Sequence, residues 1–460
     1  MTGSMTGLAL RSLRYRMTSF TATFLTVVLG TALIGSFATL TETAYGDGVS
    51  KADQEALTIM GLVVGGWGAL IVLFSLASTL SVAVRQRDVE IALLRTVGTT
   101  PRQARKMIRT ETLLVSIIGS LLGTVIASIG GQALLAMLQG GDMVADSVEF
   151  AGGPASLGTV AVLVVLVSLG SATLAGRKAT RGPATIALAD GLAGREKLRW
   201  WRVVGGLVLI GYAAILAVLT VTVMTDSSDP YAPMQTAGSA CIVAGVGFAA
   251  LAPLLLRWSS LALRPVFAIA GAPGYLAAFN ASRRSQVLSG VLGALTVFVG
   301  TTVGVMMMVG IDGRTLDAIA PDKQEADTIT LLNNVVTGMI ALFAAIMVVN
   351  SIAAAISDRR REFARLQLVG ASTSQVRDSV LAEATLVTAV GLFLGGLASV
   401  ATVVPYSIAR DEGAVPNGQL WLPIVLAVLA AAITLGASSA AARRTLDRAT
   451  ETGLTTAVAA

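Results

Sequence analysis

Long apolar runs, separated by short polar and charged segments, recur along the whole sequence. Runs of roughly 20 residues or more fall near residues 18–39, 57–83, 112–138, 155–176, 203–225, 235–256, 286–311, 328–356, 380–405 and 419–441. A helix of roughly 20 apolar residues is long enough to cross the hydrocarbon core of a bilayer, which is about 30 Å thick. The pattern therefore predicts an all-α integral membrane protein with ten transmembrane helices.

The composition supports a membrane protein. Hydrophobic residues make up 54% of the 460 residues and charged residues 13%, and the mean hydropathy is +0.76. A soluble globule of this length needs more polar surface. The first apolar run follows the basic segment LALRSLRYRM without a small-residue cleavage site, so we expect it to be retained as the first span.

The basic residues predict the orientation of the chain, because Lys and Arg in short loops stay on the cytoplasmic side. With both termini inside, ten spans place 29 of the 33 Lys and Arg on that side, and only Lys51, Arg314, Lys323 and Arg410 fall outside. The net charge of +6 therefore needs no nucleic-acid partner. Cys241, the single cysteine, excludes an intrachain disulfide.

Two segments, residues 84–123 and 356–395, have the same pattern 272 residues apart. From Arg87 to Gly123 their alignment needs no gap, and 14 of 37 positions are identical, as expected of a duplicated unit. Spans one to four and seven to ten then form two repeats around a two-span insert, a 4+2+4 arrangement. Because the insert crosses the bilayer twice, the repeats are parallel and related by a pseudo-twofold axis along the membrane normal.

This arrangement predicts the division of the chain. The expected parts are a first four-helix repeat (1–180), a linker and two-helix insert (181–264), a second four-helix repeat (265–447) and a cytoplasmic tail (448–460). The external connections are too short to fold as an extracellular domain. Each repeat carries one charged turn on the cytoplasmic side, residues 87–111 and 359–383.

The sequence of each charged turn predicts a helix, a break and a second helix. Gly98 and Gly370 follow an apolar periodic stretch and suit a left-handed helix C-terminus. The segments TPRQ (100–103) and STSQ (372–375) are capping boxes, the first with proline at the first helical position. The sequence thus predicts a rigid turn tied to two spans, so that a push on the turn moves the helices.

Four glutamates of the charged turns call for specific contacts. Glu90 and Glu362 add nothing to a basic collar, while Glu111 and Glu383 lie at the start of a span. A carboxylate there is costly unless it is paired or reaches the interface. We expect each glutamate to contact either an arginine across the turn or a partner protein, whereas the charge rule alone explains the individual arginines.

Glycine pairs four residues apart recur at the same place in both repeats. Gly119 and Gly123 in the third span correspond to Gly391 and Gly395 in the ninth. This spacing allows two helices to approach closely. We expect the four glycines to serve helix packing.

The first charged turn, EIALLRTVGTTPRQARKMIRTE, resembles the FtsX-like permease domain of ABC transporters. In that family the motif lies between the second and third helices of a four-helix unit. An amphipathic segment similar to LALRSLRYRM precedes the family's first helix, and LAAFNASRRS at residues 276–285 is a weaker echo of it. The resemblance covers nearly the whole chain and implies the ten-helix form without a large extracellular domain, in a bacterial plasma membrane.

The resemblance also implies a partner. The two charged turns are expected to act as coupling helices, each seated on one subunit of an ABC ATPase dimer in the cytoplasm. The second turn has Arg365 for Leu93 and Gln367 for Arg95, so the two need not engage the ATPase equally. The expected ATPase-coupling residues are Glu90, Leu94, Arg95, Gly98, Arg102, Arg105, Glu111, Glu362, Leu366, Gly370, Gln375, Arg377 and Glu383.

The chain itself has no motif for using ATP. It lacks Gly-x-x-x-x-Gly-Lys-Ser/Thr, so ATP and Mg are expected in the partner ATPase and no cofactor in this chain. An ion-coupled secondary transporter needs ionisable groups in its spans, and the sequence has no histidine and only Glu111 and Glu383 at span boundaries. A sodium site of carbonyls and hydroxyls stays open. We assign no catalytic residue and no metal site.

An apolar lining without buried charge suits export of a hydrophobic or amphipathic compound, such as a drug, a peptide antibiotic or a lipid. The expected substrate contacts are the flexible Met306 and Met307 and the polar Asn333, Asn334 and Asn350, although helix packing explains each equally well. The alternative is a signalling module that transmits force from an ATPase without transport. The identity of the cargo and self-association stay open.

Overall fold

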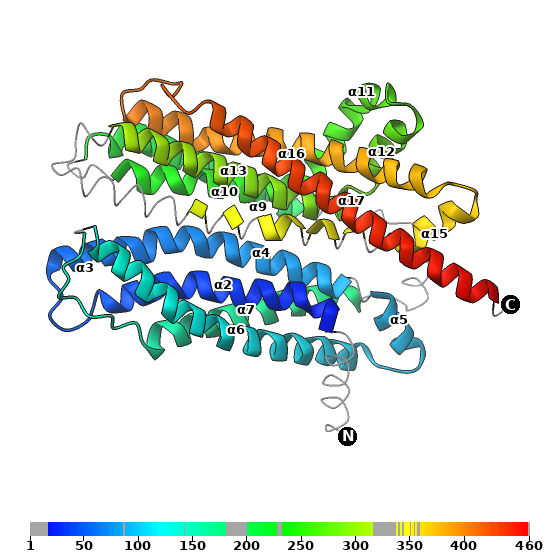
Figure 1. The fold of residues 1–460 in the computed structure, drawn as a ribbon, viewed down its shortest axis with the longest axis horizontal. Coiled ribbons are helices and arrows are strands. Elements are labelled where there is room, and N and C mark those ends of the chain that lie inside the picture. The colour runs from blue at the N-terminus through cyan, green and yellow to red at the C-terminus, as the bar shows by residue number, and fades with distance from the viewer. Residues whose placement is uncertain are drawn as a thin grey trace. The chain divides into compact units, whose positions relative to one another are not determined.

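The computed structural model describes residues 17–458 except 86–87, 142, 181–199, 228–231, 316–336, 339–340, 343–344, 350, 354 and 357–358. Every regular element in these residues is a helix (Figure 1). They form two compact units, one of residues 1–193 and 312–343 and the other of residues 194–311 and 344–460.

Eight of the helices in the described part of the chain are long and apolar enough to cross a membrane. They coincide with eight of the ten expected spans. The second expected span, 57–83, falls on a helical run that contains a π-helical turn, and the eighth, 328–356, lies largely outside the described residues. The all-helical membrane fold is therefore confirmed, while the 4+2+4 arrangement stays a prediction.

The first unit is built on four packed helices. They are α2 (Met17–Thr43), α4 (Gly65–Arg85), α6 (Pro101–Gln139) and α7 (Pro154–Ala179). Two short elements, α3 (Lys51–Ile59) and the π-helical turn η1 (Met60–Val64), lead into α4, and α5 (Asp88–Thr96) follows it. Each of the four long helices contacts at least two others, so the unit has one common core.

Glycines set how closely α2 and α6 approach. A Cβ at Gly119 would lie 2.7 Å from Val27 Cγ1, and one at Gly123 would lie 2.6 Å from Thr31 Cβ. Both distances are too short for any side chain, so glycine is required where these helices cross. The contact runs along both helices, which lie side by side in Figure 1.

The second unit contains more helices. They are α9 (Trp200–Leu219), the π-helical turn η3 (Thr220–Met224), α10 (Ala232–Ala262), α11 (Arg264–Ala268), α12 (Gly271–Arg283), α13 (Ser285–Thr315), α15 (Arg360–Leu368), α16 (Thr373–Ala409) and α17 (Trp421–Val458). Helix α13 meets α16 through glycines again, since a Cβ at Gly391 would lie 2.5 Å from Leu295 and one at Gly395 2.6 Å from Val299. The two glycine pairs thus occupy equivalent helix crossings.

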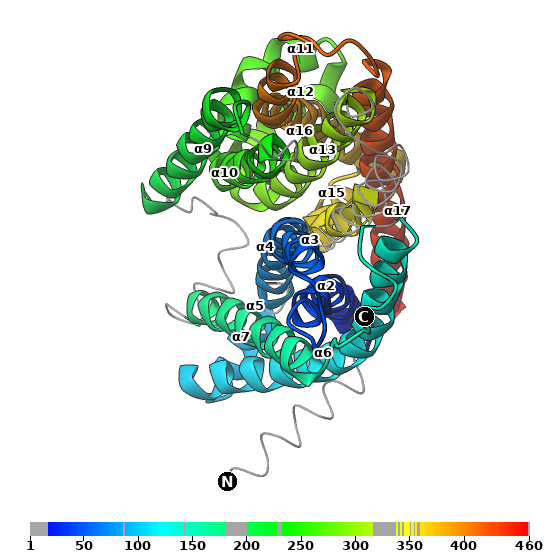
Figure 2. The ribbon, with the colours of Figure 1, turned by 90° about the vertical axis from the view of Figure 1, so that its left-hand side faces the viewer.

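Helices α9 and α10, the expected two-span insert, pack against the second repeat (Figure 2). Ala213 of α9 and Ala240 and Ala244 of α10 form one buried cluster with Ala398 of α16. The backbone N–H of Cys241 donates a hydrogen bond to Thr402 Oγ1 at 2.9 Å. The insert, expected as a separate part of the chain, therefore shares a core with α16.

Candidate functional site

The first charged turn begins where α5 ends. Gly98 has φ +108°, in the left-handed region. Its N–H donates to the Arg95 carbonyl at 3.1 Å, and the Thr99 N–H donates to the Leu94 carbonyl at 3.0 Å. This pair of bonds is the Schellman motif, which satisfies the last carbonyls of a helix.

Helix α6 then starts with a reciprocal cap. The Thr100 N–H donates to Gln103 Oε1 at 2.8 Å, and the Gln103 N–H donates to Thr100 Oγ1 at 3.3 Å. Pro101 occupies the start of the helix, where a missing N–H costs nothing. Both ends of the turn are therefore held by hydrogen bonds within a few residues.

The second charged turn has the same backbone. Gly370 has φ +98° and donates to the Gln367 carbonyl at 3.0 Å, while Ala371 donates to the Leu366 carbonyl at 2.9 Å. Ser372 and Gln375 form the matching capping box, with distances of 2.9 and 3.2 Å. The predicted glycine caps and capping boxes are confirmed in both turns.

The tip of each turn presents an apolar side chain to the outside. Val97 is 87% exposed and Val369 is 89% exposed. Leu93 and Leu94 beside the first, and Leu366 and Leu368 beside the second, are exposed as well. Sequence reasoning chose Leu94 and Leu366 but missed the two valines. The signal was present, because the Val-Gly pair recurs at the 272-residue offset.

The polar residues expected to couple to an ATPase differ in how exposed their side chains are. Arg102 is exposed, whereas Arg105 is half-buried and its Nε donates to the Pro101 carbonyl at 3.1 Å. Arg95 and Arg377 are half-buried. The side chain of Glu90 lies outside the described residues. Arg102 is thus the most accessible of these arginines.

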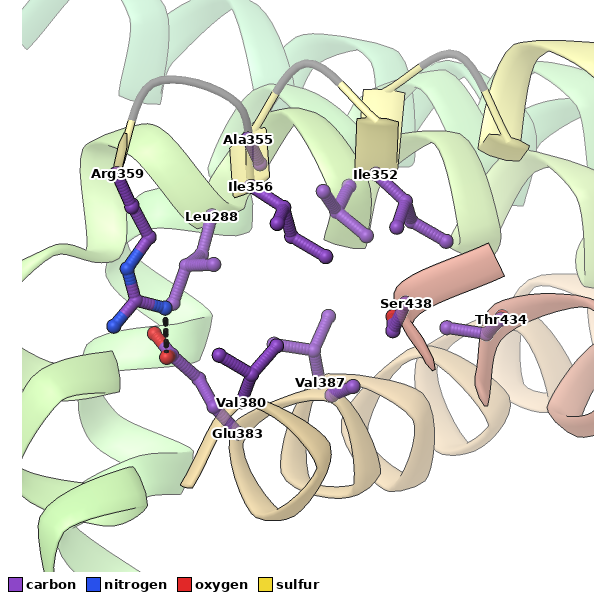
Figure 3. A pocket seen from close by; sticks show the side chains of 12 residues that line it. Leu288, Ile352, Ala355, Ile356, Arg359, Val380, Glu383, Val387, Thr434 and Ser438 are labelled. Carbon is purple, nitrogen blue, oxygen red and sulfur yellow. Dashed lines mark hydrogen bonds and ion pairs between the residues drawn. The ribbon is translucent and has the colours of Figure 1, made fainter. Parts of the chain in front are cut away.

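A chain of ion pairs anchors the second turn. Glu383 of α16 is 2% exposed and pairs with Arg359 (Figure 3). Arg359 Nε also lies 3.0 Å from Glu362 Oε2 at the start of α15. Glu362 in turn pairs with Arg284 at the end of α12. The series Arg284–Glu362–Arg359–Glu383, here called the arginine–glutamate chain, joins α12, α15 and α16.

Within the arginine–glutamate chain, the ion pairs favour the charged forms of Glu362 and Arg359. Burial alone raises the pKa of Glu362, but its bonds to Arg359 and then to Arg284 outweigh burial and leave the pKa below its usual value. Burial lowers the pKa of Arg359, yet the charge of Glu383 and the bonds to Glu362 raise it overall. At neutral pH Glu362 and Arg359 are therefore both charged.

The Arg359–Glu383 pair lies at one end of an apolar cavity in the second unit, shown in Figure 3. Side chains from α13, α16 and α17 and from residues 352–356 line it. The first unit has a cavity at equivalent positions, where Leu80, Ala83, Val84, Ile108, Glu111 and Val115 take the places of Ile352, Ala355, Ile356, Val380, Glu383 and Val387. Glu111, 1% exposed, is the counterpart of Glu383 there.

Of the residues expected to contact a substrate, the two that the structure describes, Met306 and Met307, do not line these cavities. Met307 is 2% exposed in the core around α13, and Met306 is half-buried. Asn333, Asn334 and Asn350 lie outside the described residues. Their assignment to substrate stays a prediction.

Comparison with protein families gives one match. The model of the FtsX-like permease C-terminal domain matches residues 62–184 and again residues 334–448, and together the two segments cover more than half of the chain. Their first residues, 62 and 334, are 272 positions apart, the same offset as the repeated charged turns. No curated protein matches the chain.

Proposed function

The chain belongs to the FtsX-like permease family, so it is the permease component of an ABC transporter, and we propose that its two charged turns dock on the two subunits of a separate ATPase dimer. Closure of the ATPases on ATP pushes both turns and shifts the attached helices. This shift of the helices moves a hydrophobic or amphipathic compound outward across a bacterial plasma membrane. The permease crosses that membrane ten times and has both termini in the cytoplasm.

One observation carries this proposal: each turn is a rigid backbone with an exposed valine at its tip. Val97 and Val369 are almost fully accessible, yet each lies next to a left-handed glycine that is held by two hydrogen bonds. Burying an apolar side chain in a groove of a partner is favourable by about 1.5–3 kcal/mol. A pre-formed turn loses little entropy when it binds.

The helices that follow the turns are long enough to carry a displacement across the bilayer. Helix α6 has 39 residues and α16 has 37, and at 1.5 Å per residue these are roughly 58 and 56 Å long. Neither is interrupted between its capping box and its far end. A movement of either turn is therefore passed directly to a membrane span.

The arginine–glutamate chain supplies a second connection in the second repeat. Glu362 is occupied by Arg284 and Arg359, so in this proposal it does not meet the ATPase but ties the turn to α12 and α16. Because the two ends of the arginine–glutamate chain lie on α12 and α16, a tilt of α15 pulls on both of these helices.

Docking is tested by the association of the permease with its ABC ATPase. Val97→Glu and Val369→Glu place a charge at each tip without touching the backbone bonds, and the double variant should lose at least about tenfold in affinity and lose permease-stimulated ATP hydrolysis. Val415→Glu is the matched control, because Val415 is 65% exposed and lies between α16 and α17, away from the turn. Unchanged association in the double variant would rule out docking through the tips.

Transport is tested separately from docking. The intact complex in proteoliposomes should move fluorescent amphipathic compounds against their gradient in an ATP-dependent way. If ATP hydrolysis stays coupled but no compound in a broad panel moves or stimulates it, the chain transmits force without transport, and the export part of the proposal is wrong.

A further inference from the structure

Two short helices connect α10 to α13 in the second unit, and their sequence is one-sided in charge. Residues 257–284 contain Arg257, Arg264, Arg283 and Arg284 but no Asp, Glu or Lys. Helix α11 ends before Gly271, which has φ +75° and turns the chain into α12. The resulting pair of helices, here called the α11–α12 hairpin, lies between two helices that are long enough to cross the membrane.

Helix α12 has two different faces. Its small residues Gly274, Ala277, Ala278 and Ala281 are buried, and α12 packs against α10 and α16. Its larger side chains point the other way. Exposed apolar residues of the hairpin and the neighbouring end of α10 are Trp258, Leu261, Val266, Ile269, Tyr275, Leu276 and Phe279.

Arginines and aromatic rings alternate on the exposed face. Arg264 lies 4.7 Å from the centre of the Tyr275 ring and bonds its hydroxyl. Tyr275 stacks on Phe279 with ring centres 6.4 Å apart, and Arg283 lies 5.0 Å from the Phe279 ring. Both guanidinium groups are thereby held over an apolar surface, with their remaining N–H donors available.

The neighbouring arginines at the end of α12 have separate roles. Arg283 is exposed and lies over Phe279, whereas Arg284 pairs with Glu362 in the arginine–glutamate chain. The exposed face therefore keeps its positive charge uncompensated by any acid of segment 257–284. An apolar surface with arginines at its rim is typical of a helix that lies in the membrane interface and attracts anionic lipid.

We propose that the exposed face of the α11–α12 hairpin, with Arg257, Arg264 and Arg283, is a binding site for anionic phospholipid headgroups. Tyr275, Leu276 and Phe279 insert among the upper acyl carbons, and the guanidinium groups donate hydrogen bonds to the lipid phosphates. The occupant is a phospholipid of the surrounding bilayer, because the hairpin starts and ends at membrane helices. Since this site needs no ATPase, it stands apart from the proposed docking of the turns.

The test is fluorescence quenching of Trp258, which is 67% exposed next to Arg257. The full chain, with Phe at the other four tryptophans, is reconstituted in phosphatidylcholine vesicles that contain equal amounts of phosphatidylglycerol. Bromine is carried on the acyl chains of one lipid or the other. Quenching by brominated phosphatidylglycerol should be about fivefold stronger than quenching by brominated phosphatidylcholine. This ratio is what one arginine near an anionic surface contributes. Arg257→Gln, Arg264→Gln and Arg283→Gln together should reduce the ratio to about one.

Arg314→Gln, an exposed arginine in the last turn of α13, is the charge control and should leave the ratio unchanged. Lipids that remain bound to the purified native chain, measured by mass spectrometry, give a second readout that needs no tryptophan replacement. They should be enriched in phosphatidylglycerol and lose that enrichment in the triple variant. Equal quenching by both lipids, or equal retained lipid in the native chain and the triple variant, overturns the proposal. Loss of ATPase binding in the triple variant with unchanged lipid preference would instead assign the face to a protein.

Discussion

The two charged turns have the same backbone but present different side chains. Both end a helix at a left-handed glycine and start the next with a capping box, and both expose a valine. Yet Leu93 and Arg95 in the first correspond to Arg365 and Gln367 in the second. The duplicated feature is therefore the stiffness of the turn, whereas the chemistry around the tip has diverged. The two ATPase subunits need not be held by equal contacts.

The largest expected effect comes from the buried ion pair of the second repeat. Glu383→Ala leaves Arg359 without its most buried partner, which should reduce the free energy of unfolding by about 3–5 kcal/mol. Thermal unfolding in detergent measures the loss. Arg359→Met combined with Glu383→Leu removes both charges and should cost much less, because no buried charge is left uncompensated.

Glu111→Ala is the equivalent substitution in the first repeat and tests whether both repeats depend on their buried carboxylate. Glu111 is as buried as Glu383 and occupies the equivalent place in its cavity, and Arg87 and Glu90 stand at the positions of Arg359 and Glu362. Glu111→Ala should therefore destabilise the protein by a similar amount. A loss below about 1 kcal/mol would mean that only the second repeat depends on its buried carboxylate.

An intermediate effect is expected at the two turn glycines. No atom lies within 4 Å of a Cβ placed at Gly98 or Gly370, so alanine there suffers only from its left-handed φ, about 1–2 kcal/mol. ATP hydrolysis coupled to transport should fall equally in Gly98→Ala and Gly370→Ala. Gly396→Ala, which also has open space but lies within α16, should have normal activity. Unequal losses would show that one turn dominates coupling.

A smaller effect is expected where the turns differ. If Arg95 meets an acid on the ATPase, Arg95→Gln should weaken association by about fivefold, or about 1 kcal/mol. Gln367→Arg should strengthen association at the second turn by no more than that. Binding curves of the two variants and of their combination measure both changes. Identical curves for native and Arg95→Gln complexes would leave the valine tips as the main contacts.

The smallest effect is the pH dependence that Glu362 contributes. Because its pKa is lowered in the folded protein, its ion pairs stabilise the fold above the unfolded-state pKa of about 4.3. That stability is lost as the pH falls through the lower folded value. The thermal midpoint should drop more steeply below about pH 4.3 in the native chain than in Glu362→Gln. Parallel curves would mean that Arg284 and Arg359 do not hold this carboxylate in solution.

Local features of the turns could be predicted because nearby residues determine them. A glycine after an apolar helix and a Ser/Thr–Gln pair three residues apart satisfy backbone groups within one turn of chain. The partner of Glu383 could not be chosen, because Arg359, Arg360 and Arg361 are consecutive in the sequence and only helix packing brings Arg359 to it.

Other parts of the fold and site depend on contacts that the sequence does not reveal. Val97 and Val369 were missed because an exposed valine looks the same as a buried one in a chain that is 54% hydrophobic. The packing of α9 and α10 on α16 rests on alanines such as Ala240 and Ala398, which carry no pairing information. The spans could be predicted from the lengths of the apolar runs, and their orientation from the basic residues in the short loops between them.

The placement of α9 and α10 makes the flanks of the two repeats unequal. Ile118, Leu122 and Ile126 on α6 are 54%, 49% and 46% exposed, whereas their counterparts on α16, Val390, Leu394 and Ala398, are 4%, 5% and 0% exposed. In the second repeat α10 covers α16, and Ala398 is enclosed between α9 and α10. A hydrophobic molecule in the bilayer can therefore contact the exposed apolar stripe on α6, whereas the equivalent stripe on α16 is covered. Lateral access from the lipid to these two helices thus differs between the two repeats.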